Sequence, residues 1–359
     1  MMITAGNGFI EQSDRYAFNN AGESLKKYIL LERGELAYNH GASKLRPYGS
    51  CFALTTVEKA RIPFVYHCFS VEKSNPEFLS IELNGANVEN QLRKIVSSGA
   101  RMDGLLNIAY SEYTEVTVQL PKKEEQDWIA KFFKHLDTLI TLHQRKYEKL
   151  VNIKKSMLDK MFPKNGASVP EIRFKGFTDL WEQRKLGEVF EEYSEKNHAE
   201  LPPLTIIQGG GTIRRDESER ALQYDKSSLS NYKMVNKDDF IVHLRSFEGG
   251  LEKASSQGII SPAYHTFHGE DVDSRFYYAY FRSKKFINKD LKPHVYGIRD
   301  GRSIDIEGMK TIRIPWASYP EQKSIGDFLT HLDTLITLHQ RKLEKLQNIK
   351  KSCLEKMFV

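Results

Sequence analysis

Three short motifs in this sequence could belong to an enzyme. Residues 75–78 (NPEF) differ by one residue from the N-P-P-[FY] motif with which amino-methyltransferases hold an exocyclic amine, but no F-x-G-x-G cofactor loop accompanies them. Residues 209–211 (GGG) lack the Gly-Lys-Ser/Thr ending of a phosphate-binding loop. Asp290-x-Lys292 lacks the preceding Pro-Asp of a metal-dependent nuclease, and no H-E-x-x-H or G-x-S-x-G occurs. We interpret the first two segments as turns and predict a chain without a catalytic site.

The sequence also contains no metal-binding or redox motif. The three cysteines, Cys51, Cys68 and Cys353, form no C-x-x-C pair and have no neighbouring histidine at ligand spacing. We therefore expect reduced, packed thiols, no metal site and no cofactor bound by this chain.

Basic side chains in loop-like sequence are the remaining chemical signal. Arginine and lysine neutralise phosphates, and the planar arginine fork also matches the edge of guanine. A net charge of +6 and a pI near 8.9 permit an anionic partner without requiring one. The alternative is that these residues are ordinary solvated surface charges. The candidate DNA-binding residues are Lys44, Arg46, Arg101, Arg214, Arg215, Lys253, Tyr296, Arg299 and Arg302.

Four of these candidates lie beside glycines that recur in both halves of the chain. Gly99-x-Arg101 is echoed by Gly297-x-Arg299, beside which Tyr296 and Arg302 lie. The two halves are otherwise dissimilar. Different loops on a similar scaffold are what two different base sequences would require, so Arg101 and Arg299 are our first candidates for base contacts.

The segments around these loops predict mixed α/β domains. Phe240–Leu244 and Thr311–Ile314 are typical of strands, and Ser274–Asn288 is typical of an amphipathic helix. The endings Val116–Pro121 (VTVQLP) and Lys310–Pro315 (KTIRIP) both predict a strand followed by proline.

A duplicated segment must position these domains. Gln126–Phe162 and Gln322–Phe358 are identical at 27 of 37 positions, with a constant offset of 196. Their apolar residues recur at alternating steps of four and three, the heptad pattern of a long helix. At 1.5 Å rise per residue each helix would measure roughly 55 Å. A helix of this length cannot bury its apolar stripe alone.

The simplest way to bury both stripes is to pair the two copies with each other. Because each helix leaves one domain and delivers the chain to the other, we predict an antiparallel coiled coil. Lys154 and Lys350 on the seam are expected to set register or to lie at its solvated edge. An ordinary core helix or an oligomerisation zipper is the alternative. The predicted seam includes Leu136, Ile140, Tyr147, Leu150, Leu332, Ile336, Leu343 and Leu346.

These patterns divide the chain into alternating domains and helices. The predicted parts are a first domain (1–123), a first helix (124–162), a linker (163–179), a second domain (180–319) and a second helix (320–359). The second domain opens with Leu180–Phe190 (LWEQRKLGEVF), which has no counterpart before Met1, so we expect an N-terminally incomplete first domain. No apolar run approaches ~18–20 residues, and no signal peptide is recognisable, so we expect a cytoplasmic protein.

This layout resembles the DNA-specificity subunit of type I restriction–modification systems. The resemblance rests on three phrases: W-x-x-x-x-L-G-x-[VI] at Trp181–Val189, P…EQ at Pro121–Gln126 and at residues 320–322, and L-D-x-x-I at Leu136–Ile140 and Leu332–Ile336. It implies two α/β (α+β) target-recognition domains, separated by two long antiparallel coiled-coil helices.

The resemblance also implies a function. Each recognition domain would read one half of a bipartite double-stranded DNA site, and the helix pair would fix the gap between the halves. Two methyltransferase subunits that use S-adenosylmethionine and restriction/translocase subunits that use ATP and Mg would carry the chemistry, while this chain would hold no cofactor.

Three alternatives remain open from the sequence. The chain could be a coiled-coil scaffold that binds no DNA. It could also be a silent or phase-variable specificity-gene copy that donates its second domain by recombination. The first domain could instead be completed in trans by another chain, or by the C-terminus of this one.

Overall fold

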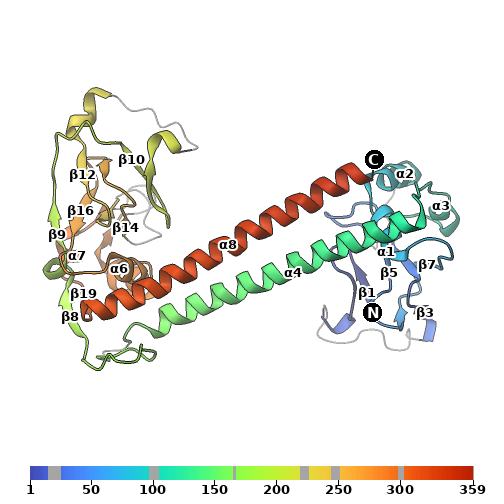
Figure 1. The fold of residues 1–359 in the computed structure, drawn as a ribbon, viewed down its shortest axis with the longest axis horizontal. Helices are drawn as coiled ribbons and strands as arrows, with labels where there is room; N and C mark the ends of the chain where they lie inside the picture. Colours follow the sequence, from blue (N-terminus) through green and yellow to red (C-terminus); the bar gives the residue numbers. More distant parts are fainter. Residues whose placement is uncertain are drawn as a thin grey trace. The chain divides into compact units, whose positions relative to one another are not determined.

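The computed structural model describes residues 1–14, 26–96, 105–164, 167–218, 226–243, 251–297 and 303–358 (Figure 1). The chain forms two compact units. Unit 1 contains Met1–Gln144 together with Gln340–Val359, and unit 2 contains Arg145–His339. Each unit therefore includes part of both long helices.

The long helices are α4 (Lys123–Lys160) and α8 (Tyr319–Met357). In unit 1, Asp137 of α4 forms an ion pair with Lys350 of α8. In unit 2 the reciprocal pair joins Lys154 to Asp333. The start of one helix thus lies beside the end of the other in both units, which confirms the predicted antiparallel pairing. The two seam lysines bind aspartates of the opposite helix.

The predicted seam residues lie on the sheltered side of both helices. Leu136, Leu332 and Leu343 are buried. The other members are half-buried, namely Ile140, Tyr147, Leu150, Ile336 and Leu346.

Unit 1 is built from short antiparallel strands and three small helices. Two strand pairs are β1 (Met2–Thr4) with β2 (Gly8–Ile10), and β3 (Ile29–Glu32) with β6 (Lys59–Ile62). A three-stranded sheet places β4 (Leu36–Asn39) between β5 (Ser50–Ala53) and β7 (His67–Phe69). The helices are α1 (Pro76–Glu82), α2 (Ala86–Ile95) and α3 (Tyr110–Thr114).

Unit 2 has a larger sheet in the order β14-β13-β16-β9. Its strands are Glu252–Lys253, Phe240–Val242, His265–His268 and Glu191–Tyr193 respectively. Four further antiparallel pairs are β8 (Glu182–Lys185) with β19 (Arg313–Trp316), β10 (Leu204–Ile207) with β11 (Gly211–Arg214), β12 (Lys233–Val235) with β15 (Gly258–Ile260), and β17 (Val295–Tyr296) with β18 (Ser303–Ile304). Its short helices are α5 (Leu186–Val189), α6 (Ser274–Phe281) and α7 (Ile306–Lys310).

The two units share an order of elements. Unit 1 from β1 to α3 follows the order of unit 2 from β10 to α7. Each begins with a hairpin, β1–β2 or β10–β11. A strand pair follows, β3–β6 or β12–β15, with two sheet strands between its members in sequence, and a helix (α1 or α6) comes after the last sheet strand. The elements β8, α5 and β9 of unit 2 have no counterpart among the described elements of unit 1.

This difference explains one wrong prediction. Val116–Pro121 was expected to be a strand, but the structure contains none there. Its equivalent in unit 2, β19, forms a ladder with β8. An isolated extended segment gains no ladder hydrogen bonds, so the same apolar pattern stays irregular in unit 1.

Three other boundaries differ from the sequence-based expectation. The helix expected over Ser274–Asn288 ends at Phe281 and is followed by a π-helical turn, Phe286–Leu291. The strand expected over Thr311–Ile314 is shifted to β19, and Leu244 lies outside the described residues. The NPEF segment begins helix α1 rather than forming a turn: Asn75 caps the helix by accepting a hydrogen bond from Phe78 N at 3.0 Å.

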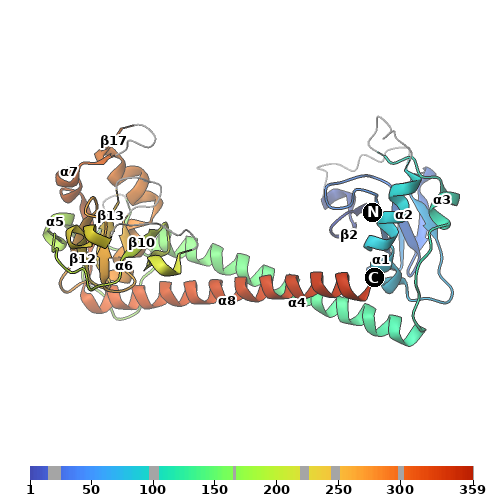
Figure 2. The ribbon, with the colours of Figure 1, turned by 90° about the horizontal axis from the view of Figure 1, so that it is seen from above.

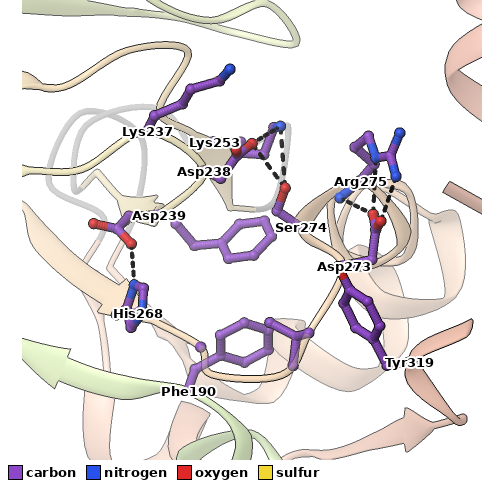
Figure 3. A pocket seen from close by; sticks show the side chains of 13 residues that line it. Phe190, Lys237, Asp238, Asp239, Lys253, His268, Asp273, Ser274, Arg275 and Tyr319 are labelled. Atoms are coloured by element: carbon purple, nitrogen blue, oxygen red, sulfur yellow. Dashed lines mark hydrogen bonds and ion pairs between the residues drawn. The ribbon is translucent and has the colours of Figure 1, made fainter. Parts of the chain in front are cut away.

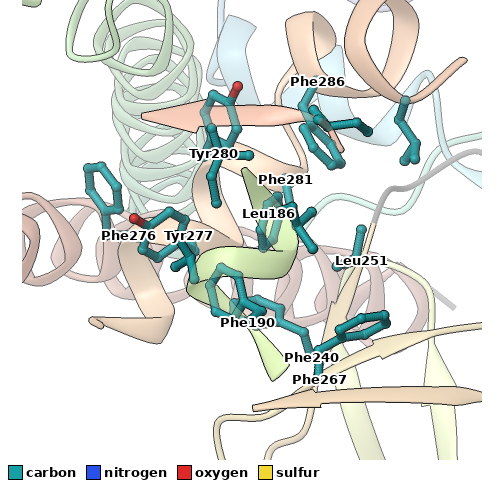
Figure 4. Packing of buried hydrophobic residues seen from close by; sticks show 14 of the residues in the cluster. Leu186, Phe190, Phe240, Leu251, Phe267, Phe276, Tyr277, Tyr280, Phe281 and Phe286 are labelled. Carbon is teal, nitrogen blue, oxygen red and sulfur yellow. The ribbon is translucent and has the colours of Figure 1, made fainter. Parts of the chain in front are cut away.

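An aromatic core fixes helix α6 within unit 2 (Figure 4). Asp273 caps α6 by accepting hydrogen bonds from Arg275 N and Phe276 N. Edge-to-face contacts hold the sheet against the helix, as between Phe240 and Phe281, whose ring centroids are 5.0 Å apart. The fully buried rings are Phe190, Phe240, Phe267, Phe276, Tyr277, Tyr280, Phe281 and Phe286.

A buried glutamine ties each domain to the helix that follows it. In unit 1, Gln126 Oε1 accepts from Asn75 N at 2.8 Å, and its Nε2 donates to Pro121 O at 2.9 Å. In unit 2, Gln322 makes the same two bonds, with Asp273 N at 3.0 Å and with Ala317 O at 2.8 Å. The glutamine of the repeated P…EQ phrase therefore fixes the start of each long helix on α1 or α6.

Helix α8 also approaches α6 closely (Figures 1 and 2). At Gly326 an added Cβ would lie 2.6 Å from Asp273 Oδ1 and 3.2 Å from Arg275 Cβ. Glycine is needed at this point of the helix because the cap of α6 occupies the space.

No helix of the described residues is both long enough and apolar enough to cross a membrane.

Candidate nucleic-acid interface

The β10–β11 hairpin of unit 2 is held in place by a buried carboxylate. Glu252 is fully buried and accepts from Gly209 N at 2.7 Å and from Gly211 N at 3.3 Å. Tyr278 donates its hydroxyl to the same carboxylate at 2.9 Å, and Arg282 forms an ion pair with it. Glycine suits both backbone positions, since φ is +75° at Gly209 and +74° at Gly211. The turn predicted over residues 209–211 is confirmed, and it is rigidly supported.

The tip of this hairpin faces solvent. Gln208, Gly209 and Gly210 are exposed, while the flanking Gly211 and Thr212 are buried. The exposed amide of Gln208 is thus presented by a backbone that Glu252 holds. A glutamine amide can bond both N6 and N7 of adenine in the major groove.

Unit 1 has a corresponding hairpin. The tip between β1 and β2 exposes Gly6 and Asn7, and Gly8 takes a φ of +66° against the ring of Phe52. Asn39 anchors this hairpin by donating to Ile3 O at 3.2 Å. Each unit therefore presents one amide side chain at a supported tip. Neither residue is basic, so neither was among the candidates predicted from the sequence.

One of the predicted basic residues of unit 2 is exposed, and two others are engaged in contacts within the fold. Arg214 is exposed and bonds Asp216 with its Nε and Nη2, at 3.1 and 2.9 Å, and this carboxylate raises its pKa. Arg215 packs its guanidinium over the Tyr232 ring at 5.2 Å and donates to Leu204 O. Lys253 is largely buried against Asp238. Arg215 and Lys253 therefore hold the fold of unit 2.

In unit 1 the predicted residues lie in the loop between β4 and β5. Lys44 is exposed. Arg46 donates to Asn84 O at 2.5 Å and pairs with Glu89 at 3.2 Å, so it fastens the loop to the start of α2.

The remaining predicted residues belong to the glycine landmarks. Tyr296 is exposed on β17, which pairs with β18. Arg101, Arg299 and Arg302 lie outside the described residues. Their roles stay predictions.

A polar pocket of about 470 Å³ lies between the sheet and the start of α6 in unit 2 (Figure 3). Six of its charged side chains form pairs: Lys253 with Asp238, His268 with Asp239, and Arg275 with Asp273. Lys237 also lines the pocket and belongs to none of these pairs. Asp239 also accepts from Tyr193, and burial together with this carboxylate raises the pKa of the Tyr193 hydroxyl. These pairs link the sheet strands and the start of α6, so they stabilise the fold of unit 2.

The cysteines are free thiols, as expected. Cys51 is buried in unit 1, and burial raises its pKa to about 12. Within the described ranges no group of three or more histidine, cysteine or acidic residues could hold a metal ion.

Comparison with known proteins gives consistent matches. The family model described as type I restriction modification DNA specificity domain matches residues 178–348. The chain is 24% identical over 350 residues to a specificity subunit assigned to the type I restriction enzyme MjaX of Methanocaldococcus jannaschii, covering 92% of this chain and 78% of that protein. It is 25% identical over 275 residues to the MjaVIII specificity subunit of the same organism, covering 71% and 64%.

A solved structure supports the fold. The crystal structure of the type I restriction–modification system S subunit from M. genitalium superposes with a TM-score of 0.55 at 14% identity, covering 92% of this chain and 84% of that one. At this identity the likeness concerns the fold alone.

Two related α/β domains, each closed by the ends of paired long helices, form the architecture to which these comparisons refer. Residues 178–348 match the DNA specificity domain of type I restriction–modification systems, and the chain as a whole is similar to type I specificity subunits. Such subunits recognise DNA and are not catalytic, which supports the prediction of a non-catalytic chain.

Proposed function

We propose that this chain recognises a bipartite double-stranded DNA site, with each unit reading one half-site. The observation that carries the proposal is the repeated scaffold with unlike surfaces. The same order of elements ends in the same glutamine-anchored helix in both units, while the exposed hairpin tips differ in sequence. A shared frame with different tips suits two readers of different base sequences.

Within each unit we assign base contacts to the amide at the hairpin tip. Gln208 and Asn7 are exposed, and the hydrogen bonds beneath each tip limit the entropy lost on binding. Exposed Arg214 and Lys44 suit contacts with phosphates.

Replacing one tip amide should alter one half-site only. We expect Gln208→Ala to cost ~1–3 kcal/mol of binding and to relax one position of the unit 2 half-site, with the unit 1 half-site unchanged. Asn7→Ala is the matched control and should do the reverse. Methylation sequencing of cells expressing each variant reports both halves. A uniform loss of methylation with unaltered sequence preference would refute the base-reading role.

We propose further that the helix pair sets the gap between half-sites. Two linked weak readers bind tightly only where both engage at once, which requires one separation and one rotation on the duplex. The reciprocal ion pairs Asp137–Lys350 and Lys154–Asp333 hold one register of α4 against α8. Exposed pairs contribute at most ~1 kcal/mol each, so the apolar seam supplies most of the stability and the ions select the register.

Removing one heptad from both helices should shorten the preferred gap. Deleting residues 141–147 and 337–343 preserves the seam and removes roughly 10 Å of helix, the rise of about three base pairs. The control replaces Thr141 and Thr337 by serine and should leave the gap unchanged. Methylation sequencing of the deletion variant would contradict the ruler role if the original gap persisted.

Exposed apolar residues form a stripe along one face of α4. Trp128 is 72% exposed, Leu142 51%, Phe132 42% and Leu139 41%, and their spacing places them along one helical face in unit 1. Exposed apolar residues at helical spacing favour packing against another helix. We assign this stripe to a modification subunit, on which S-adenosylmethionine would be bound. We propose that the full complex contains two such modification subunits together with restriction subunits that depend on ATP and Mg.

Trp128 should be a strong contributor to that contact. Because a buried interface tryptophan commonly contributes ~2 kcal/mol or more, Trp128→Ala should weaken binding of the purified modification subunit about 30-fold. Ser324→Ala, at the equivalent position of α8, is the control. Unchanged affinity of the Trp128 variant by titration calorimetry would exclude the stripe as the docking surface.

A further inference from the structure

Trp181 fills a defined slot in unit 2. The indole is buried and lies edge-on to Phe162 and Phe276, with ring centroids 6.3 and 5.6 Å away. Its Nε1 donates to Glu321 Oε2 at 3.0 Å, and Arg173 pairs with the same buried carboxylate. Two aromatic walls and one carboxylate therefore recognise this side chain.

Unit 1 contains counterparts of the three residues that contact Trp181, namely Phe162, Phe276 and Glu321. Phe78 stands at the place of Phe276, with an offset of 198, and belongs to α1 as Phe276 belongs to α6. At the helix offset of 196, the counterparts of Phe162 and Glu321 are Phe358 and Glu125.

These unit 1 residues surround a pocket of about 320 Å³. Phe358 packs beside Phe78, with ring centroids 5.7 Å apart. Glu125 is exposed, whereas its counterpart Glu321 is buried beneath Trp181. Among the residues that the structure describes in unit 1, none occupies the position of the Trp181 indole.

The strands around this pocket are also incomplete in unit 1. In unit 2 the segment Trp181–Tyr193 supplies two strands: β8 pairs with β19, and β9 pairs with β16. In unit 1, residues 116–119 form no strand, and β7 pairs only with β4 in the described part of the sheet.

Burial follows the same difference. Phe267 of β16 and Ile314 of β19 are fully buried in unit 2. Their unit 1 counterparts, Phe69 at an offset of 198 and Val118 at an offset of 196, are half-buried.

β7 therefore has one edge without a strand partner in the described part of the sheet. At residues 116–119 the Gln91 side chain holds the place of a strand, because it donates to Thr117 O at 2.8 Å and accepts from Thr117 N at 2.9 Å. An added strand could replace these two bonds and cover the partly exposed apolar side chains.

We propose that unit 1 binds, in trans, a tryptophan-bearing segment with the pattern of Trp181–Tyr193. The indole would enter the pocket between Phe78 and Phe358 and donate to Glu125. The strand before the following Leu-Gly would pair with residues 116–119 in place of the Gln91 side chain, and the strand after it would pair with β7. Glu82, which stands at the place of Tyr280, adds a second carboxyl to the pocket wall and suits the basic residues that follow the tryptophan. The proposal is independent of DNA recognition.

A synthetic peptide of residues Leu180–Tyr193 tests this site on the full chain. Titration calorimetry should give a 1:1 complex, and hydrogen exchange should show protection of β7 and residues 116–119. The peptide carrying Trp181→Ala should bind at least tenfold more weakly, because the tryptophan is the anchor. The protein variant Glu125→Gln should also bind more weakly, while Glu124→Gln, its neighbour outside the pocket, should bind normally.

Three results would overturn the proposal. The first is absence of binding at millimolar peptide. The second is binding that ignores Trp181→Ala in the peptide. The third is protection confined to β16 and β19, since the peptide would then have replaced the equivalent segment of unit 2.

Discussion

The structure depends on the need of two long helices to bury one apolar stripe each. A single helix of 38 or 39 residues has no core of its own, and each copy finds in the other a partner with the same spacing. Antiparallel pairing brings the end of each helix to the start of the other within a unit. The terminal aromatic residues then become part of the neighbouring domain: Phe162 packs on Phe276 and Tyr280 in unit 2, and Phe358 packs on Phe78 and Phe133 in unit 1. Neither domain is complete without the end of the helix contributed by the other half of the chain.

This arrangement separates what must be constant from what can vary. Gln126 and Gln322 fix the helix starts, and the aspartate–lysine pairs fix the register. The hairpin tips take part neither in anchoring the helices nor in setting their register. Their sequences can therefore change without loss of the frame, which is what a family of DNA readers with different targets requires.

Much of the frame could be predicted from the sequence, because heptads and repeats are local patterns. The antiparallel pair follows from spacing and from chain linkage, and the heptad places Lys154 and Lys350 on the seam, whereas their aspartate partners were seen only in the structure. The misplaced strand at Val116–Pro121 shows the limit: a strand needs a partner, and the partner segment in unit 2 lies far away along the chain. The helix expected over Ser274–Asn288 was overextended because its apolar pattern continues through the π-helical turn.

The candidate site was harder to predict, because the partners of charged residues are not visible in sequence. Arg46, Arg215 and Lys253 have the right chemistry for DNA, yet Glu89, Tyr232 and Asp238 engage them within the fold. Gln208 and Asn7 became candidates only when the structure showed supported, exposed tips.

Disulfide cross-linking between α4 and α8 tests their antiparallel pairing. In a Cys353→Ser background, we predict intramolecular cross-links for Asp137→Cys with Lys350→Cys and for Lys154→Cys with Asp333→Cys. Preferential cross-linking of Asp137→Cys with Asp333→Cys, the parallel register, or cross-links only between separate chains, would contradict it.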